Sequence, residues 1–192
     1  MSPQFSLSLR HRSGFSMVEL LSVVTVIGIL ASISTNAMVG ASRRATANQA
    51  RSQLILLGQA LAEYKLFYGD YPHTDKAEDL YDALTGRLGP NPGARLSPAG
   101  KVFLSHISQF NLSSPQSIGA TGSGTNTLLD AWGMPYTYVY KVPAGAGWKN
   151  PDYVLFSDGP DRKHKTPVSN TQGFPPTTLS GDDADNIYEP AH

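Results

Sequence analysis

The stretch FSMVELLSVVTVIGILASISTNAMVGAS, residues 15–42, decides the fold of this chain. After Glu19 the next charged residue is Arg43, so residues 20–42 form an uncharged run of 23 residues. As an α-helix this run is about 35 Å long at about 1.5 Å per residue, and the hydrocarbon core of a bilayer is about 30 Å thick. The sequence therefore predicts a helix that can cross a membrane and that carries a carboxylate close to its start.

Glu19 leaves three interpretations of this segment. A cleaved secretory signal peptide would explain the basic residues before the apolar run, but Glu19 interrupts that run and no clean A-x-A site follows it. In a plain membrane anchor, Glu19 could lie at the positive end of the helix dipole, although an intramembrane carboxylate is costly and is by default functional. In the third interpretation the chain is cut between Gly14 and Phe15. The new Phe15 ammonium of a neighbouring subunit then pairs with Glu19 and sets the axial register of stacked subunits.

The residues around Glu19 carry a specific pattern. RSGFSMVELL, residues 12–21, resembles the class III signal of type IV pilins and type II secretion pseudopilins. That signal is a short basic leader, a glycine, an aromatic residue, and a glutamate at the fifth mature position before a long apolar run. The resemblance implies cleavage between Gly14 and Phe15 by a prepilin peptidase, N-methylation of Phe15, and a role for Glu19 in assembly. Asn36 departs from the pattern, because many relatives have a proline there.

The helical pattern continues beyond the apolar run. Apolar residues recur at intervals of three and four: Ala47, Ala50, Leu54, Leu57, Leu61, Tyr64 and Tyr68. This spacing places them in one stripe along a helix, which we interpret as a face that packs on the head, with a short coiled-coil seam as the alternative. Polar residues such as Gln53 are expected off this stripe. Gly69 and Pro72 predict the end of the helix.

The remainder of the chain predicts a small head that is rich in loops. A short helix is expected over residues 78–84, whereas 86–100 and the low-complexity stretch 111–127 are expected to be irregular. Aromatic and β-branched residues at 137–140 and 153–156 predict two strands of an antiparallel hairpin that covers the apolar stripe. Trp132 is expected to fill the core.

The predicted fold class is therefore α+β. A long N-terminal helix, half transmembrane and half amphipathic, packs on a small antiparallel sheet in a pilin-like lollipop. The expected organisation is a leader peptide at 1–14, a transmembrane and assembly helix at 15–42, an amphipathic helix at 43–69, and a periplasmic head with an acidic C-terminal loop at 70–192.

Three further segments extend the resemblance along most of the chain. YKLFYGDYP (64–72), DAWGMPYTY (130–138) and YVLFSDGPD (153–161) resemble, in order, the signatures of the major type II secretion pseudopilin. Ala131, Arg162 and two long insertions, at about 82–127 and 163–181, depart from it. The resemblance implies a structural subunit of a periplasmic filament that drives protein export. The subunit would be held in the bacterial inner membrane by a single pass before assembly.

The resemblance also implies the partners of such a subunit. They are further copies of the chain, the prepilin peptidase, minor pseudopilins, an inner-membrane assembly platform and inner-membrane lipid. The alternative within this family is a type IV pilus or DNA-uptake pilin. Many such pilins close the C-terminal loop with a disulfide, whereas this chain has no cysteine. A secreted binding domain and an anchored adhesin that never polymerises are the alternatives from other classes.

Charge and motif content argue against other functions. The chain has 15 cationic and 15 acidic residues and a formal net charge of zero, so nucleic acid is not an expected partner. No nucleophile elbow, phosphate-binding loop or H-x-x-x-H metal motif occurs in the sequence. We therefore expect no enzymatic activity.

Acidic residues gather in the C-terminal region. Asp158 and Asp161 precede a proline-containing loop, and Asp182, Asp183 and Asp185 follow it. Calcium takes six to eight oxygen ligands from such loops, although aspartate is also frequent in turns for purely structural reasons. The family's corresponding loop carries a calcium site, and the resemblance therefore implies Ca²⁺ bound by a ligand set that we place at Asp161, Asp182, Asp183 and Asp185. Asp161 and Asp185 match the pattern best, and Asn186 replaces a second aspartate.

Overall fold

The computed structural model describes residues 14–90, 95–96, 99–114, 126–141, 147–164 and 173–189, with the side chains of 33–39 left aside. The chain divides into two compact units, Met1–Arg43 and Arg44–His192. Apart from Gly14, the expected leader at 1–14 lies outside the described residues.

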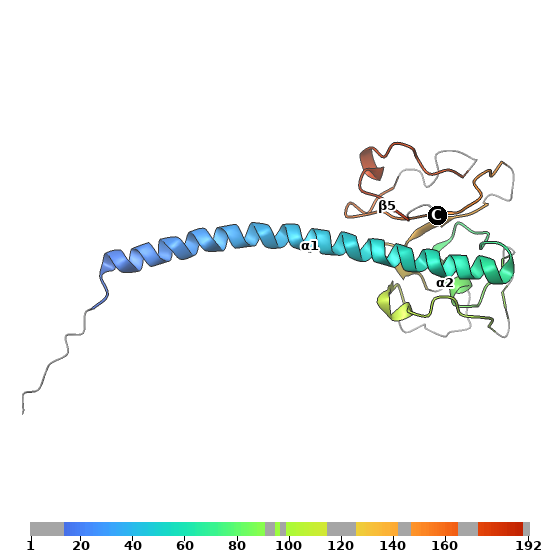
Figure 1. The fold of residues 1–192 in the computed structure, drawn as a ribbon, viewed down its shortest axis with the longest axis horizontal. Helices are drawn as coiled ribbons and strands as arrows, with labels where there is room; N and C mark the ends of the chain where they lie inside the picture. Colours follow the sequence, from blue (N-terminus) through green and yellow to red (C-terminus); the bar gives the residue numbers. More distant parts are fainter. Residues whose placement is uncertain are drawn as a thin grey trace, which may run out of the picture. The chain divides into compact units, whose positions relative to one another are not determined.

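Helix α1, Met17–Tyr68, contains the whole uncharged run of residues 20–42 (Figure 1). It begins after Ser16, whose hydroxyl oxygen accepts a hydrogen bond from the Val18 amide at 3.4 Å. It ends where predicted, since Gly69 adopts a positive φ of 88° and its amide donates to the Lys65 carbonyl at 2.7 Å. Glycine adopts this left-handed conformation without a Cβ penalty and so terminates the helix.

The apolar stripe on the second half of α1 forms one wall of the core, as predicted. Five of its seven residues are buried: Ala50, Leu54, Leu57, Leu61 and Tyr64. Gln53 lies off the stripe, as expected, but its side chain is only 3% exposed. Its Nε2 donates to the Gln109 carbonyl at 2.6 Å, and its Oε1 accepts from the Tyr136 hydroxyl at 2.8 Å. Gln53 lies three and four residues from Ala50 and Leu57, so the buried face of the helix is wider than the stripe.

The predicted hairpin forms the main sheet. Strand β3, Thr137–Val139, pairs antiparallel with β4, Val154–Ser157. The sheet has the order β3-β4-β5, and its third strand, β5 at Ile187–Tyr188, was not predicted. A second antiparallel pair joins β1, Asn111–Leu112, to β2, Leu128–Leu129, so the expectation of an irregular 111–127 is wrong at its first two residues.

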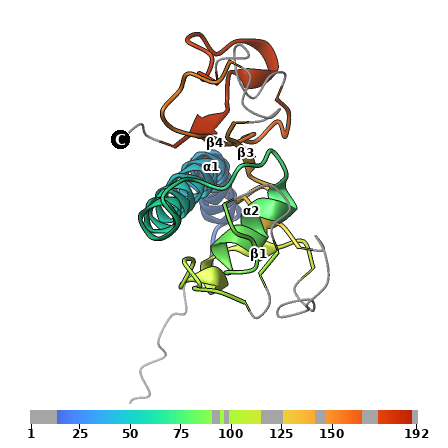
Figure 2. The same cartoon turned by 90° about the vertical axis from the view of Figure 1, so that its right-hand side faces the viewer.

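Within the Arg44–His192 unit, α1 has the three-stranded sheet on one side and α2, Ala77–Leu84, on the other (Figures 1 and 2). Two 3₁₀ turns complete the described elements, η1 at Ile107–Gln109 and η3 at Gly181–Asp183. The Tyr138 side chain of β3 and the Tyr153 side chain just before β4 pack against the α1 stripe in one hydrophobic cluster. Trp132 is only half-buried and lies outside this cluster, so its predicted place in the core is wrong.

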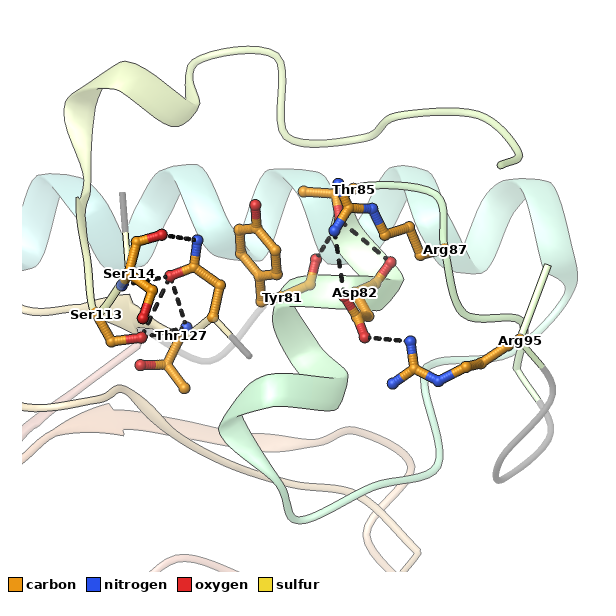
Figure 3. A network of polar contacts seen from close by, with 9 residues as sticks. Tyr81, Asp82, Thr85, Arg87, Arg95, Ser113, Ser114 and Thr127 are labelled. Carbon is orange, nitrogen blue, oxygen red and sulfur yellow. Dashed lines mark hydrogen bonds and ion pairs between the residues drawn. The ribbon is translucent and has the colours of Figure 1, made fainter. Parts of the chain in front are cut away.

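The first long insertion is fixed to the head by a buried carboxylate (Figure 3). The Asp82 side chain is 3% exposed, and its Oδ2 lies 2.7 Å from Nη1 of Arg95. Its Oδ1 lies 3.9 Å from Nη1 of Arg87. A buried charge requires such partners, because its desolvation costs several kcal/mol. The ion pairs therefore tie residues 87 and 95 to helix α2.

Candidate functional site

The predicted processing site is open to solvent. Phe15 is 77% exposed, and no atom lies within 4 Å of the position that a Cβ on Gly14 would take. Both residues precede the first turn of α1 and have no regular secondary structure. The Gly14 and Phe15 residues on either side of the predicted cleavage bond are therefore accessible to solvent.

Glu19 lies in the first turn of α1. Its backbone amide donates to the Ser16 carbonyl at 3.0 Å, and its side chain is exposed. Among the described residues, no lysine, arginine or histidine forms an ion pair with its carboxylate. The helix dipole favours an acidic residue here, but the single chain provides no cationic partner within its described part.

The first unit carries an apolar surface with no covering. Its exposed apolar side chains are Phe15, Met17, Val18, Leu20, Leu21, Val23, Val24, Val26, Ile27, Ile29 and Leu30. Exposed apolar patches of this kind mark protein or membrane contacts. Within the residues that the structure describes, no helix combines the length and the apolar character needed to cross a membrane.

The acidic C-terminal loop brings two of the predicted calcium ligands together. The Asp161 amide donates to Oδ2 of Asp185 at 3.0 Å. This close approach depends on Gly159, which has φ +74°, because a Cβ there would lie 2.4 Å from the Asp185 carbonyl oxygen. The turn after β4 is thereby held against the segment that leads into β5.

The other two predicted ligands differ in their surroundings. Asp183 is 9% exposed, and its Oδ1 accepts from Nδ2 of Asn186 at 3.2 Å, while Asp182 is exposed. The Asn186 Oδ1 is buried without a hydrogen-bond partner. Burial raises the pKa of the nearby Tyr188 phenol, and the negative charges of Asp183 and Asp158 raise it further.

Asp158, which lies outside the predicted ligand set, is the most buried carboxylate of this loop, at 4% exposure. Its Oδ1 lies 3.0 Å from Nδ1 of His164. Asp158 follows the strand β4 directly in the sequence, and this position could have marked it as a candidate ligand. No group of three or more acidic, histidine or cysteine side chains is arranged to hold a metal ion in the described segments. In these segments Asp161 and Asp185 are in contact, but the predicted ligands do not form a single cluster.

Comparison with known proteins relates these features to a family. Residues 9–35 match the prokaryotic N-terminal methylation motif. The type II secretion system core protein G of Escherichia coli (strain K12) is 36% identical over 149 residues, which cover 77% of this chain and 81% of the relative. The chain belongs to the type II secretion system core protein G family. The predicted family is confirmed, and the chain is a pseudopilin, a structural subunit of the cell envelope and not an enzyme.

Other relatives agree with this assignment. The core protein G of Pseudomonas aeruginosa is 27% identical over 154 residues, 80% of this chain and 87% of the relative. That of Aeromonas hydrophila is 36% identical over 70 residues, which cover 36% of this chain and about half, 49%, of the relative. No solved structure matches the chain at a significant level. The α+β arrangement of a long helix with a small antiparallel sheet is the one predicted.

Proposed function

We propose that this pseudopilin is cleaved between Gly14 and Phe15 and methylated at Phe15 by a prepilin peptidase, and then polymerises into a periplasmic filament that drives protein export. Before assembly, residues 15–42 hold it in the inner membrane with its head in the periplasm. Assembly requires minor pseudopilins and an inner-membrane platform. The apolar surface of the first unit contacts lipid first and neighbouring subunits afterwards.

The uncovered apolar surface of residues 15–30 is the observation that carries this proposal. Eleven large apolar side chains are exposed there. Such a surface is stable in water only if lipid or another chain covers it. Glu19 interrupts this surface. A carboxylate in apolar surroundings needs a cation, and the new ammonium of Phe15 in a second copy provides one.

The variant Glu19→Ala tests the assembly step in the full chain produced with its secretion system. We expect normal cleavage, seen as an unchanged shift in intact mass, together with loss of filaments sheared from the cells. Asp75→Ala is the matched control, since Asp75 is an exposed acid of the head. Filament yield from Glu19→Ala equal to that of the control would show that the carboxylate does not act in assembly.

Calcium binding by the acidic loop is part of the proposal. We infer that Asp161, Asp182, Asp183 and Asp185 supply oxygen ligands to Ca²⁺, which would neutralise their charge and hold the loop against the sheet. Support comes from the hard oxygen donors and from the buried Asn186 Oδ1, which has no hydrogen-bond partner.

Thermal unfolding of the full chain in detergent, with and without Ca²⁺, tests the calcium site. A ligand at 100 times its Kd stabilises the folded state by about 2.7 kcal/mol. We expect added Ca²⁺ to raise the Tm, chelation to reverse the rise, and Mg²⁺ to have a much smaller effect. The Asp183→Asn variant should lose the response. A Tm that is the same with and without Ca²⁺ would exclude the calcium site.

A further inference from the structure

Three large apolar side chains are exposed together at the end of α1, and we name them the apolar knob. Leu66 and Phe67 belong to the last turn of α1 and are 88% and 58% exposed. Val102, from the insertion at about 82–127, is 54% exposed. Its segment lies against the helix end, because the ring centroids of Phe67 and Phe103 are 5.8 Å apart. Single exposed apolar residues are ordinary, but a group of them marks a contact surface.

The same head also carries an apolar concavity, which we name the aromatic hollow. Its volume is about 430 Å³. Its wall is made mainly of apolar side chains, including Tyr153, Leu155, Phe174, Pro175 and Tyr188. Phe174 and Pro175 belong to the insertion at about 163–181. An apolar cavity of about 150 Å³ holds a benzene ring, so the aromatic hollow has room for a phenyl ring together with a neighbouring aliphatic side chain.

The two carboxylates of the aromatic hollow have partners in their own chain. Asp152 accepts a hydrogen bond from the Tyr71 phenol, and Glu189 accepts one from the Tyr153 phenol. Glu189 is also packed closely on α1, because a Cβ on Gly58 would clash with its carboxylate. The surface left for a ligand is therefore the apolar wall, which an apolar group from another molecule would cover.

The apolar knob and the aromatic hollow adjoin different sides of α1. The Phe103 amide, next to Val102, donates to the Leu84 carbonyl at the end of α2 at 2.9 Å, so the knob adjoins α2. The hollow is lined by residues of β4 and β5, which lie across α1 from α2 (Figures 1 and 2). Among the described residues, no side chain of the knob lines the hollow. The knob therefore does not fill the hollow of its own chain.

We propose that the apolar knob of one copy of this chain packs into the aromatic hollow of a second copy. Two complementary surfaces at different places on one subunit give a heterologous contact, which repeats along an open helical assembly instead of closing in a dimer. This inference rests on the proposed filament and adds a contact between heads. Both surfaces include residues of the two insertions that depart from the family's pattern, so the contact belongs to chains that carry both insertions.

The size of the knob limits what this contact can do alone. A stable interface buries about 800 Å² of each partner, and three partly exposed side chains supply less than that. The contact therefore orients subunits that the apolar surface of residues 15–30 has already brought together. It adds to assembly and does not replace the role of α1.

Filament yield from the full chain in its native secretion system tests the contact by substitution. Leu66→Gln should lower the yield about tenfold, because burying a leucine side chain changes an equilibrium constant by about one to two powers of ten. Phe174→Gln should have an effect of similar size, and the double variant should be no worse than either single one, because both remove the same contact. Leu179→Gln is the matched control, since Leu179 is an exposed leucine of the second insertion that does not line the hollow. Its yield should stay within about twofold of wild type.

Thermal unfolding in detergent shows whether the variants fold. Leu66→Gln should keep its Tm within about 2 °C of wild type, because Leu66 is almost fully exposed. Equal yields from folded Leu66→Gln and from Leu179→Gln would overturn the inference and leave the proposed function standing. A wild-type chain that forms no filaments would overturn the proposed function instead.

Cross-linking gives a second test that does not depend on yield. The chain has no cysteine, so two differently tagged chains, Leu66→Cys and Pro175→Cys, can be produced together. A short bismaleimide should join a Leu66→Cys chain to a Pro175→Cys chain, and a chain with both substitutions should give a ladder of linked copies. Asp75→Cys in place of Leu66→Cys is the control and should give no joined pair. Joining of Leu66→Cys chains to one another, or of Pro175→Cys only to a different protein, would overturn the inference.

Discussion

Removal of Arg95 alone should destabilise the head more than removal of Arg95 together with its partner Asp82. In Arg95→Met, the Asp82 carboxylate stays buried and keeps only the longer contact to Arg87, at 3.9 Å. Breaking a buried pair from one side costs about 3–5 kcal/mol. Because Arg95 is 37% exposed and Arg87 remains, we expect a loss at or just below the lower limit of this range, about 2–3 kcal/mol.

The double variant Asp82→Leu/Arg95→Met removes the buried charge together with its partner. It should recover at least half of the lost free energy, because no uncompensated carboxylate remains. In thermal unfolding of the full chain in detergent, Arg95→Met should lower the Tm by about 5–10 °C for a domain of this size. Arg162→Met, at an exposed position, is the control. A Tm drop under about 1 °C, or a double variant less stable than Arg95→Met, would refute the reasoning.

Two further predictions concern the core and the end of α1. Gln53→Leu should lower the free energy of unfolding by about 2–4 kcal/mol, because the buried Tyr136 hydroxyl and Gln109 carbonyl both lose their partner. Gln59→Leu, at an exposed position of the same helix, should change the free energy of unfolding by less than about 0.5 kcal/mol. Denaturant titrations measure both values, and equal effects of the two substitutions would contradict the prediction. Burial opposes the ionisation of Asp70, but hydrogen bonds from Lys141, Tyr140, His73 and the Tyr71 amide lower its pKa well below the ordinary value of 3.8. Such a group stabilises the fold above its unfolded pKa and loses that effect as the pH falls toward its folded pKa. Asp70→Asn should therefore lower the Tm at pH 7, and its difference from wild type should shrink below pH 3.8; a difference that is constant with pH would argue against it.

Periodicity predicted most of the fold. The stripe from Ala50 to Tyr64, the end of α1 at Gly69 and the β3–β4 hairpin depend on local residue patterns, and local patterns are what a sequence displays. The short strands β1, β2 and β5 were missed, since each has two residues and its pairing depends on distant segments. The burial of Gln53 was not predicted, because it depends on two partners 56 and 83 residues away.

The candidate sites also differ in how far the sequence alone predicts them. Gly14, Phe15 and Glu19 were predicted as site residues from a contiguous motif, and all three are exposed in the structure. The acidic loop was found from composition, but composition does not give the distances among Asp161, Asp183 and Asp185.

Intact mass and N-terminal sequencing of the protein purified from membranes of its native host test the central claim most directly. The account predicts a chain that begins at Phe15 and carries one N-terminal methyl group. A chain that begins after about residue 37, as an ordinary signal peptide would leave, or that retains residues 1–14, would contradict it.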